Sequence, residues 1–176
     1  MKQRIALWLA FCAALGVAVL ACVPRLFLTA EDETGKIVFL RIVYEGDRYA
    51  VRFIHSVARR PVDEIYEIAP DASVLRETVY DMTGAGLPYQ PEAGQTFSIE
   101  NGKYVIRGFD VRIPALTYRI SKVVADHTLL IGGDEIRLRD LVSSPGKPLT
   151  FRVRRMSPAE AFPIWRELRA RKEKGE

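Results

Sequence analysis

With 176 residues, the chain is long enough for one domain and too short for two domains of ordinary size. Hydrophobic residues make up 48% of it, which predicts a packed core and excludes a largely disordered protein. The net charge of +4 is uneven: residues 25–151 carry 16 basic and 18 acidic side chains, whereas residues 152–176 carry 8 and 4. The body of the chain therefore shows no basic bias of the kind that nucleic-acid binding requires, and we expect no nucleic-acid partner.

The cysteines and the first residues indicate the compartment. Cys12 and Cys22 both lie in the N-terminal apolar segment, so the remaining chain cannot contain a cysteine nucleophile, a cysteine-ligated zinc ion or an internal disulfide. Lys2 and Arg4 precede an uncharged run over residues 5–23. As a helix this run would be roughly 28 Å long, close to the thickness of the bilayer core. It is apolar on every face, which argues against a helix of a soluble protein.

Three interpretations of residues 1–24 are open. An uncleaved signal-anchor fits the length best. A cleaved signal peptide would have its small-residue site near residues 18–21, and a lipoprotein would use Cys22, although Leu20 is unusual before such a cysteine. The basic flank favours an N-terminus inside the cell. We therefore expect a protein of the inner (plasma) membrane, with its folded domain on the periplasmic or extracellular side.

The next segments predict a mostly β domain. Residues 25–35, with Glu31, Asp32 and Glu33, are expected to be a polar linker, and residues 36–156 the domain itself. The strands are expected at residues 36–43, 49–55, 62–68, 73–80, 95–100, 103–107, 123–131, 135–138 and 149–153, with residues 111–118 as an edge or bulged strand because of Pro114. Many short strands at regular spacing predict a single antiparallel β-sandwich or small barrel.

Turn and helix signals divide the strands. Hairpins are expected around residues 45–48, around Asn101-Gly102, which suits a type I′ turn, and around residues 132–134; residues 81–94 are expected to form a loop. Ser157 and Glu160 predict a capped helix start, and residues 157–176 are expected to form an amphipathic basic helix. Its apolar face is expected to comprise Ala161, Ile164, Trp165 and Leu168.

The stretch from Val51 to Ile68 holds the candidate functional residues. In an extended chain Val51, Phe53 and His55 share one face, and Arg52, Ile54 and Ser56 the other. A strand–turn–strand unit would then bring His55 or Ser56 near Glu64.

Three roles for these residues can be compared. Ser56 with His55 and Glu64 resembles a hydrolase set, but neighbouring residues on a strand face opposite ways and no nucleophile elbow is present. His55, His127 and Glu64 are ligand types that zinc accepts, but nothing in the spacing brings the two histidines together. A structural role for His55, hydrogen-bonded at a strand end, is favoured over both, so we expect no catalytic residue, metal or cofactor.

The glycine-rich segment around Gly84 and Gly86 has two interpretations. Its glycines can simply permit tight turns, with Leu87 filling the core. Alternatively, successive backbone N–H groups form an anion-binding nest beside Arg52 or Arg59 (or the neighbouring Arg60), and a carboxylate ligand would suit such a site.

Three motifs carry a resemblance to a known family. They are Phe53-Ile54-His55-Ser56-Val57 followed by Glu64; Gly84-Ala85-Gly86-Leu87-Pro88; and Asp126-His127-Thr128-Leu129 followed by Asp140-Leu141. In order and spacing the chain resembles, over most of residues 36–153, small bacterial proteins encoded beside the fused membrane subunit of TAXI-type TRAP transporters. The C-terminal helix lies outside the resemblance, and no catalytic residue is transferred by it.

The resemblance implies an exported accessory domain in a transport context. We therefore expect a membrane-anchored, non-enzymatic accessory subunit whose partner is a TRAP-type permease or a solute-binding protein. The alternative is a small periplasmic binding module for an organic anion such as a carboxylate. The residues expected to bind the ligand or partner are Arg52, His55, Ser56, Arg59, Glu64, Gly84, Gly86 and His127.

Overall fold

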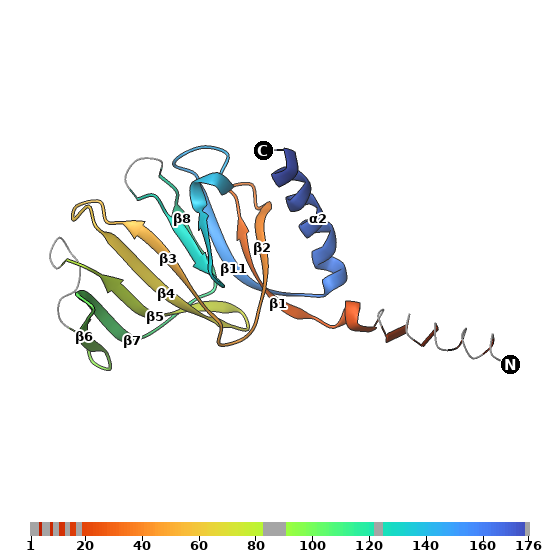
Figure 1. Ribbon diagram of the computed structural model, residues 1–176, viewed down its shortest axis with the longest axis horizontal. Helices are drawn as coiled ribbons and strands as arrows, with labels where there is room; N and C mark the ends of the chain where they lie inside the picture. Colours follow the sequence, from red (N-terminus) through yellow and green to blue (C-terminus); the bar gives the residue numbers. More distant parts are fainter. Residues whose placement is uncertain are drawn as a thin grey trace.

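A computed structural model of the chain describes residues 19–82, 91–121 and 125–174, and in addition positions 4, 8, 11–12 and 15–16. Strands dominate these ranges, and a helix follows them (Figure 1). The elements are β1 (Arg25–Glu31), β2 (Ile37–Val43), β3 (Arg48–Ile54), β4 (Pro61–Ala69), β5 (Ala72–Tyr80), β6 (Thr96–Glu100), β7 (Lys103–Ile113), β8 (Leu116–Arg119), β9 (Thr128–Ile131), β10 (Asp134–Arg137), the short 3-10 helix η1 (Leu138–Leu141), β11 (Pro148–Met156) and α2 (Pro158–Lys174).

The strands form two antiparallel sheets. One has four strands in the order β2-β1-β11-β8, and the other has seven in the order β10-β9-β3-β4-β5-β7-β6. Figure 1 shows the sheets beside each other, with α2 on the side of the four-stranded sheet that faces away from the larger one. The expected mostly β fold is thus confirmed in its sandwich-like form, because the two sheets are separate and do not close into one barrel.

The main core lies between the two sheets. Leu28 and Phe151 come from the four-stranded sheet, Val51 and Leu129 from the seven-stranded sheet, and all four side chains are fully buried. Burying each such side chain stabilises a fold by roughly 1.5–3 kcal/mol. A second, smaller cluster lies farther along the larger sheet and consists of Val62, Tyr80 and Ile106 with partly buried aromatic neighbours.

The polar-linker prediction is wrong for residues 25–31, which form β1 in the centre of the four-stranded sheet. Leu26, Leu28 and Ala30 alternate toward the core between the sheets, and Phe27 and Thr29 on the other face are buried as well. Glu31 is accommodated because its carboxylate pairs with Arg152 and Arg154 on the other face of the sheet.

The hairpin predicted around residues 45–48 is also wrong. Asp47 does close a turn, since its carboxylate accepts a hydrogen bond from the Tyr44 backbone N–H at 2.9 Å. The two strands then diverge: β2 pairs with β1 in the smaller sheet, whereas β3 pairs with β4 and β9 in the larger one. The turn therefore connects the two sheets, because both edges of β3 are occupied by other strands.

The other two hairpins are confirmed. Asn101 and Gly102 join β6 to β7, and residues 132–133 join β9 to β10. Arg41 of β2 ties this second turn to the four-stranded sheet: its guanidinium donates to the Ile131 carbonyl at 2.8 Å and pairs with Asp134 at 2.7 Å. The separate strand expected over residues 111–118 is wrong in its bounds, because β7 continues to residue 113 and β8 begins at residue 116.

The C-terminal helix begins as predicted. The Ser157 backbone N–H donates to Glu160 at 2.7 Å, and the Glu160 N–H donates to the Ser157 hydroxyl at 3.2 Å, which is a capping box. Ala161 is buried, and Ile164 and Leu168 are half-buried, where α2 packs against β2. Trp165, expected on that face, is instead 46% exposed.

Among the described residues, no helix is long and apolar enough to cross a membrane. Many positions of the expected span, residues 5–23, lie outside the described part of the chain.

Candidate functional site

The turn between β3 and β4 is closed by hydrogen bonds that centre on His55. Its backbone N–H donates to the Arg60 carbonyl at 2.9 Å, and its carbonyl accepts from the Arg59 N–H at 2.8 Å. Its Nδ1 accepts a hydrogen bond from the Ala58 N–H at 3.2 Å. The imidazole therefore holds the turn in shape, which is the structural role that the sequence favoured.

The tip of this turn is exposed. Val57 is 70% exposed, and Ser56 and Arg59 are exposed beside it. Arg59 has a φ of 56°, a left-handed conformation that residues with a β-carbon rarely adopt. The tip of the turn thus combines a fixed backbone with exposed side chains and one residue in the left-handed region.

Glu64 lies on the inner face of β4, opposite Val51 rather than His55. Its Oε2 accepts hydrogen bonds from the Tyr66 hydroxyl at 2.8 Å and from the Tyr118 hydroxyl at 2.6 Å. Tyr118 belongs to β8 of the four-stranded sheet, so this contact joins the two sheets across the core. The expected approach of His55 or Ser56 to Glu64 is wrong, because the β3–β4 register places His55 beyond Ile54, which pairs with Pro61.

Burial and charge keep the tyrosine hydroxyls protonated. Burial is the main cause that raises the pKa of Tyr66, and the Glu64 carboxylate adds to it. Burial likewise raises the pKa of Tyr118, followed by the effects of Tyr66 and Glu64. Both hydroxyls therefore act as donors, and Glu64 is held as a structural acceptor inside the sandwich.

His127 lies immediately before β9 and is 7% exposed. Its ring lies 5.1 Å from the Tyr118 ring and 5.8 Å from the Phe53 ring, measured between centroids. Burial lowers the pKa of His127, and its Nδ1 has no hydrogen-bond partner among the described residues. His127 thus shares Tyr118 as a neighbour with Glu64, whereas His55 lies apart at the turn.

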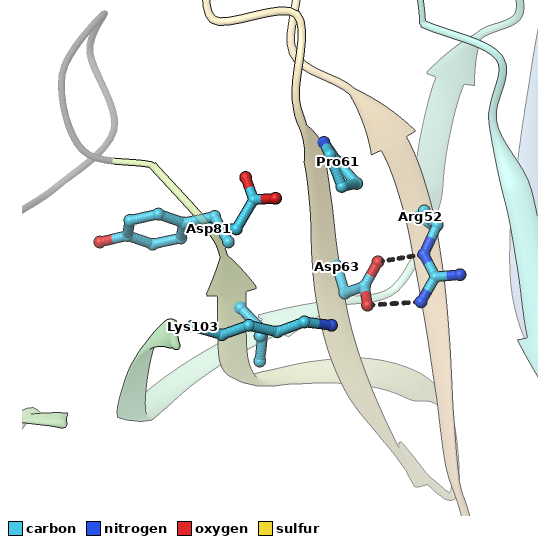
Figure 2. A pocket seen from close by; sticks show the side chains of 7 residues that line it. Arg52, Pro61, Asp63, Asp81 and Lys103 are labelled. Carbon is cyan, nitrogen blue, oxygen red and sulfur yellow. Dashed lines mark hydrogen bonds and ion pairs between the residues drawn. The ribbon is translucent and has the colours of Figure 1, made fainter. Parts of the chain in front are cut away.

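A pocket of about 300 Å³ lies on the outer face of the larger sheet (Figure 2). Arg52 and Asp63 form a bidentate ion pair in it, with N–O distances of 2.7 and 2.9 Å. The Lys103 side chain extends toward that pair in Figure 2. The lining residues are Arg52, Pro61, Asp63, Val79, Tyr80, Asp81 and Lys103.

The charges of this pocket balance. Arg52 and Lys103 contribute two positive charges, and Asp63 and Asp81 contribute two negative ones. Asp81 is itself paired with Arg60, whose guanidinium holds the pKa of that carboxyl below its usual value. Two of the three guanidinium groups that the sequence offered for a carboxylate ligand, those of Arg52 and Arg60, are therefore engaged by aspartates of the same chain.

The residues predicted for the site fall into three groups. His55, Ser56 and Arg59 share the exposed turn; Glu64 and His127 face the interior; and Arg52 faces the outer pocket. Gly84 and Gly86, with the nest proposed for them, lie outside the described residues. Within the described ranges, no group of three or more histidine, cysteine, aspartate or glutamate side chains is placed to hold a metal ion.

Sequence reasoning missed the partners of these residues. Asp63 could have been found, because the short turn between the two strands places it directly across from Arg52. Tyr118 is 54 positions from Glu64 and comes from the other sheet, and no local pattern indicates that contact.

These observations define a sandwich-like β domain with an exposed turn at one end of its larger sheet. Residues 49–138 match a domain of unknown function, DUF1850. This match covers half of the chain, and the chain belongs to that family. It extends from β3 to the first residue of η1 and is shorter than the range of the resemblance noted from the sequence. Comparisons with curated proteins and with solved structures found no match.

Proposed function

We propose that the protein is a membrane-anchored, extracytoplasmic and non-enzymatic accessory subunit of a TRAP-type (TAXI) solute transporter. It binds the permease or the solute-binding protein through the turn between β3 and β4. The apolar run over residues 5–23 with its basic flank supports the anchoring. The resemblance of the motifs around His55, Gly84 and His127 supports the transport context.

The exposed turn carries the proposal. Three hydrogen bonds fix its backbone, so little conformational entropy is lost when a partner binds it. Val57 offers an apolar contact and Arg59 a cation for which the described part of the chain provides no ion-pair partner. Arginine is one of the residues that are enriched in the binding hot spots of protein interfaces.

The hydrogen bonds of Glu64 and His55 support binding rather than chemistry. Glu64 is used as an acceptor by two tyrosines, and the His55 imidazole is used by its own turn. Neither group has the geometry of a base that faces a bound substrate.

The organic-anion alternative has less support from the geometry. A ligand carboxylate would have to displace Asp63 from Arg52 in a pocket whose charges already balance. Lys103 is the one group there that could favour it, since its ammonium has no ion-pair partner among the described residues.

Photo-crosslinking in the native host tests the proposal. A photoreactive phenylalanine derivative replaces Val57 in the full-length protein, and the same derivative replaces Ile99, which is 64% exposed on edge strand β6, as the control. The expected result is a crosslink from position 57, and not from position 99, to a TRAP-type permease or solute-binding protein. Equal crosslinking from positions 57 and 99 would contradict the proposal. The absence of any crosslink from position 57 to a permease or a solute-binding protein would contradict it as well.

Arg59→Gly provides a second variant that does not disturb the fold. Glycine adopts a φ of 56° without strain, so the folded state should keep or gain stability. The same variant removes the exposed guanidinium. We expect crosslinking from position 57 to fall while the melting temperature is unchanged or higher.

A further inference from the structure

Helix α2 has a second face that no other described residue covers. Ala161, Ile164 and Leu168 lie against the sheet, whereas Phe162 is 57% and Trp165 46% exposed. Positions 162, 165, 166 and 169 are three and four residues apart, so they form one stripe along the helix. The rings of Phe162 and Trp165 stack at 6.1 Å, and the Arg169 guanidinium lies 5.5 Å from the Trp165 ring.

We call this stripe the aromatic–basic face, and its helix begins near the point where the apolar N-terminal segment joins β1. In the sheet register Arg25 lies directly opposite Met156, two residues before α2 begins. Figure 1 shows the start of β1 and the start of α2 at the same end of the four-stranded sheet. Only Pro24 separates Val23, the last residue of the apolar run, from β1.

The short connection restricts the distance between domain and bilayer. A residue of extended chain spans at most about 3.6 Å, so one or two residues hold the domain within about 7 Å of the apolar run. The sequence had suggested a polar linker of eleven residues (25–35) there, which would have allowed much more freedom. Because β1 begins at Arg25, that freedom is removed.

The chemistry of the surrounding surface suits a lipid headgroup region. Ile42 and Tyr44, at the end of β2 that pairs with the start of β1, are 47% and 62% exposed. Arg25, Arg155 and Arg166 are exposed, and none of them has an ion-pair partner in the described part of the chain. Aromatic side chains beside unpaired cations are typical of segments that lie at the interface of an anionic bilayer.

We propose that the aromatic–basic face of α2 lies on the surface of the bilayer and binds anionic phospholipid headgroups. The inference rests on the membrane anchoring in the proposed function. Phe162 and Trp165 enter the headgroup region, and Arg166 contacts lipid phosphates. Arg169, which pairs with Glu173 at 3.1 Å, stays over the Trp165 ring. The outer face of the four-stranded sheet then faces the membrane, and the turn at Val57 belongs to the larger sheet on the other side of the core.

The chain offers a single-tryptophan reporter for this contact. Its two tryptophans are Trp8 and Trp165, so Trp8→Phe in the full-length protein leaves only the residue of interest. The variant is reconstituted in phosphatidylcholine vesicles with and without phosphatidylglycerol. Quenching of Trp165 by lipids brominated near the headgroup is compared with quenching by iodide in solution. Alkaline carbonate extraction reports separately whether the chain stays anchored.

The proposal predicts that the fluorescence emission of Trp165 is shifted to shorter wavelength. Brominated lipid should quench most of this emission, and iodide should quench little of it. Arg166→Glu should weaken the dependence on phosphatidylglycerol. A control with Trp8→Phe, Trp165→Phe and Ile99→Trp should show the reverse quenching pattern. Iodide quenching of Trp165 in protein that resists carbonate would overturn this proposal alone. Release of the protein by carbonate would overturn the anchoring, and this inference with it.

Discussion

The Tyr118 hydroxyl of the four-stranded sheet lies 2.6 Å from the Glu64 carboxylate of the seven-stranded sheet. This hydrogen bond crosses the core of the sandwich and shares its acceptor oxygen with Tyr66. It explains how an acidic residue that the sequence marked as functional can face the interior. The carboxylate is stabilised by two donors whose own burial keeps them protonated.

Tyr118→Phe is expected to lower the free energy of unfolding by about 1.5–3 kcal/mol, the range for a hydrogen bond to a charged group. The substitution removes one donor to Glu64 and keeps the ring packing. Tyr104→Phe is the matched control, since the Tyr104 ring stacks on Tyr80 and Phe97 but its hydroxyl has no partner in the described part of the chain. Urea unfolding measures both. Similar losses in the two variants would disprove the role of the inter-sheet bond.

His127→Phe is expected to remove part of the pH dependence of stability. Burial lowers the pKa of His127 below its usual value of 6.5, so protonation favours the unfolded chain. The resulting stability is fully present above about pH 6.5 and is lost as the pH falls toward the folded-state pKa, by up to about 1.4 kcal/mol per pH unit. The measurement is the free energy of unfolding of the wild type and of the His127→Phe variant as a function of pH, from about pH 6.5 downward. An unchanged slope in the variant would show that His127 is not responsible.

Gly108→Ala is expected to be strongly destabilising. Gly108 has a φ of 92° in β7, and an added β-carbon would lie 2.4 Å from the Gly94 carbonyl oxygen. The variant would therefore carry both left-handed strain, about 1–3 kcal/mol, and a backbone clash. Gly133→Ala is the control. An added β-carbon at position 133 meets open space, so only the strain of its φ of 86° destabilises that variant. Thermal melting should show a clearly larger loss at position 108, and equal losses would contradict the close approach.

Ser157→Ala is expected to lower stability by about 1 kcal/mol through loss of the helix cap. The hydroxyl accepts the Glu160 N–H at 3.2 Å, and its removal leaves that donor to solvent. Ser144→Ala should be neutral, since the exposed Ser144 has no hydrogen-bond partner in the described residues. Circular dichroism during thermal unfolding distinguishes them. If the two variants melt alike, the cap does not stabilise α2 measurably.

Local signals in the sequence were sufficient for most elements. The Asn101-Gly102 turn, the residue 132–134 turn and the Ser157–Glu160 cap each depend on a few adjacent residues, and the structure confirms all three. β1 also had a local signal, the alternation of Leu26, Leu28 and Ala30, but its acidic end at Glu31 concealed it. The pairing of Glu31 with Arg152 and Arg154 that makes this strand acceptable comes from the far end of the chain.

The candidate site depended on contacts that a local pattern cannot give. His55 and Glu64 are close in sequence, yet the register of β3 and β4 separates them, and Tyr118 from the other sheet takes the carboxylate. Likewise the guanidinium of Arg52, which the sequence suggested for a ligand carboxylate, is engaged by its cross-strand partner Asp63. The way in which the two sheets assemble decides which strands pair and which side chains meet across the core.

Affinity purification of the full-length protein from its native host in mild detergent, with mass spectrometry of the bound proteins, tests the central claim most directly. Val57→Asp is compared with Ile99→Asp, because both residues are well exposed and neither substitution removes core packing. The account predicts that a TRAP-type permease or solute-binding protein is recovered with the wild type and with Ile99→Asp, and is lost with Val57→Asp. The account would be contradicted if the wild type recovered neither a permease nor a solute-binding protein. It would also be contradicted if the two variants recovered such a partner equally, because binding would then not depend on the β3–β4 turn.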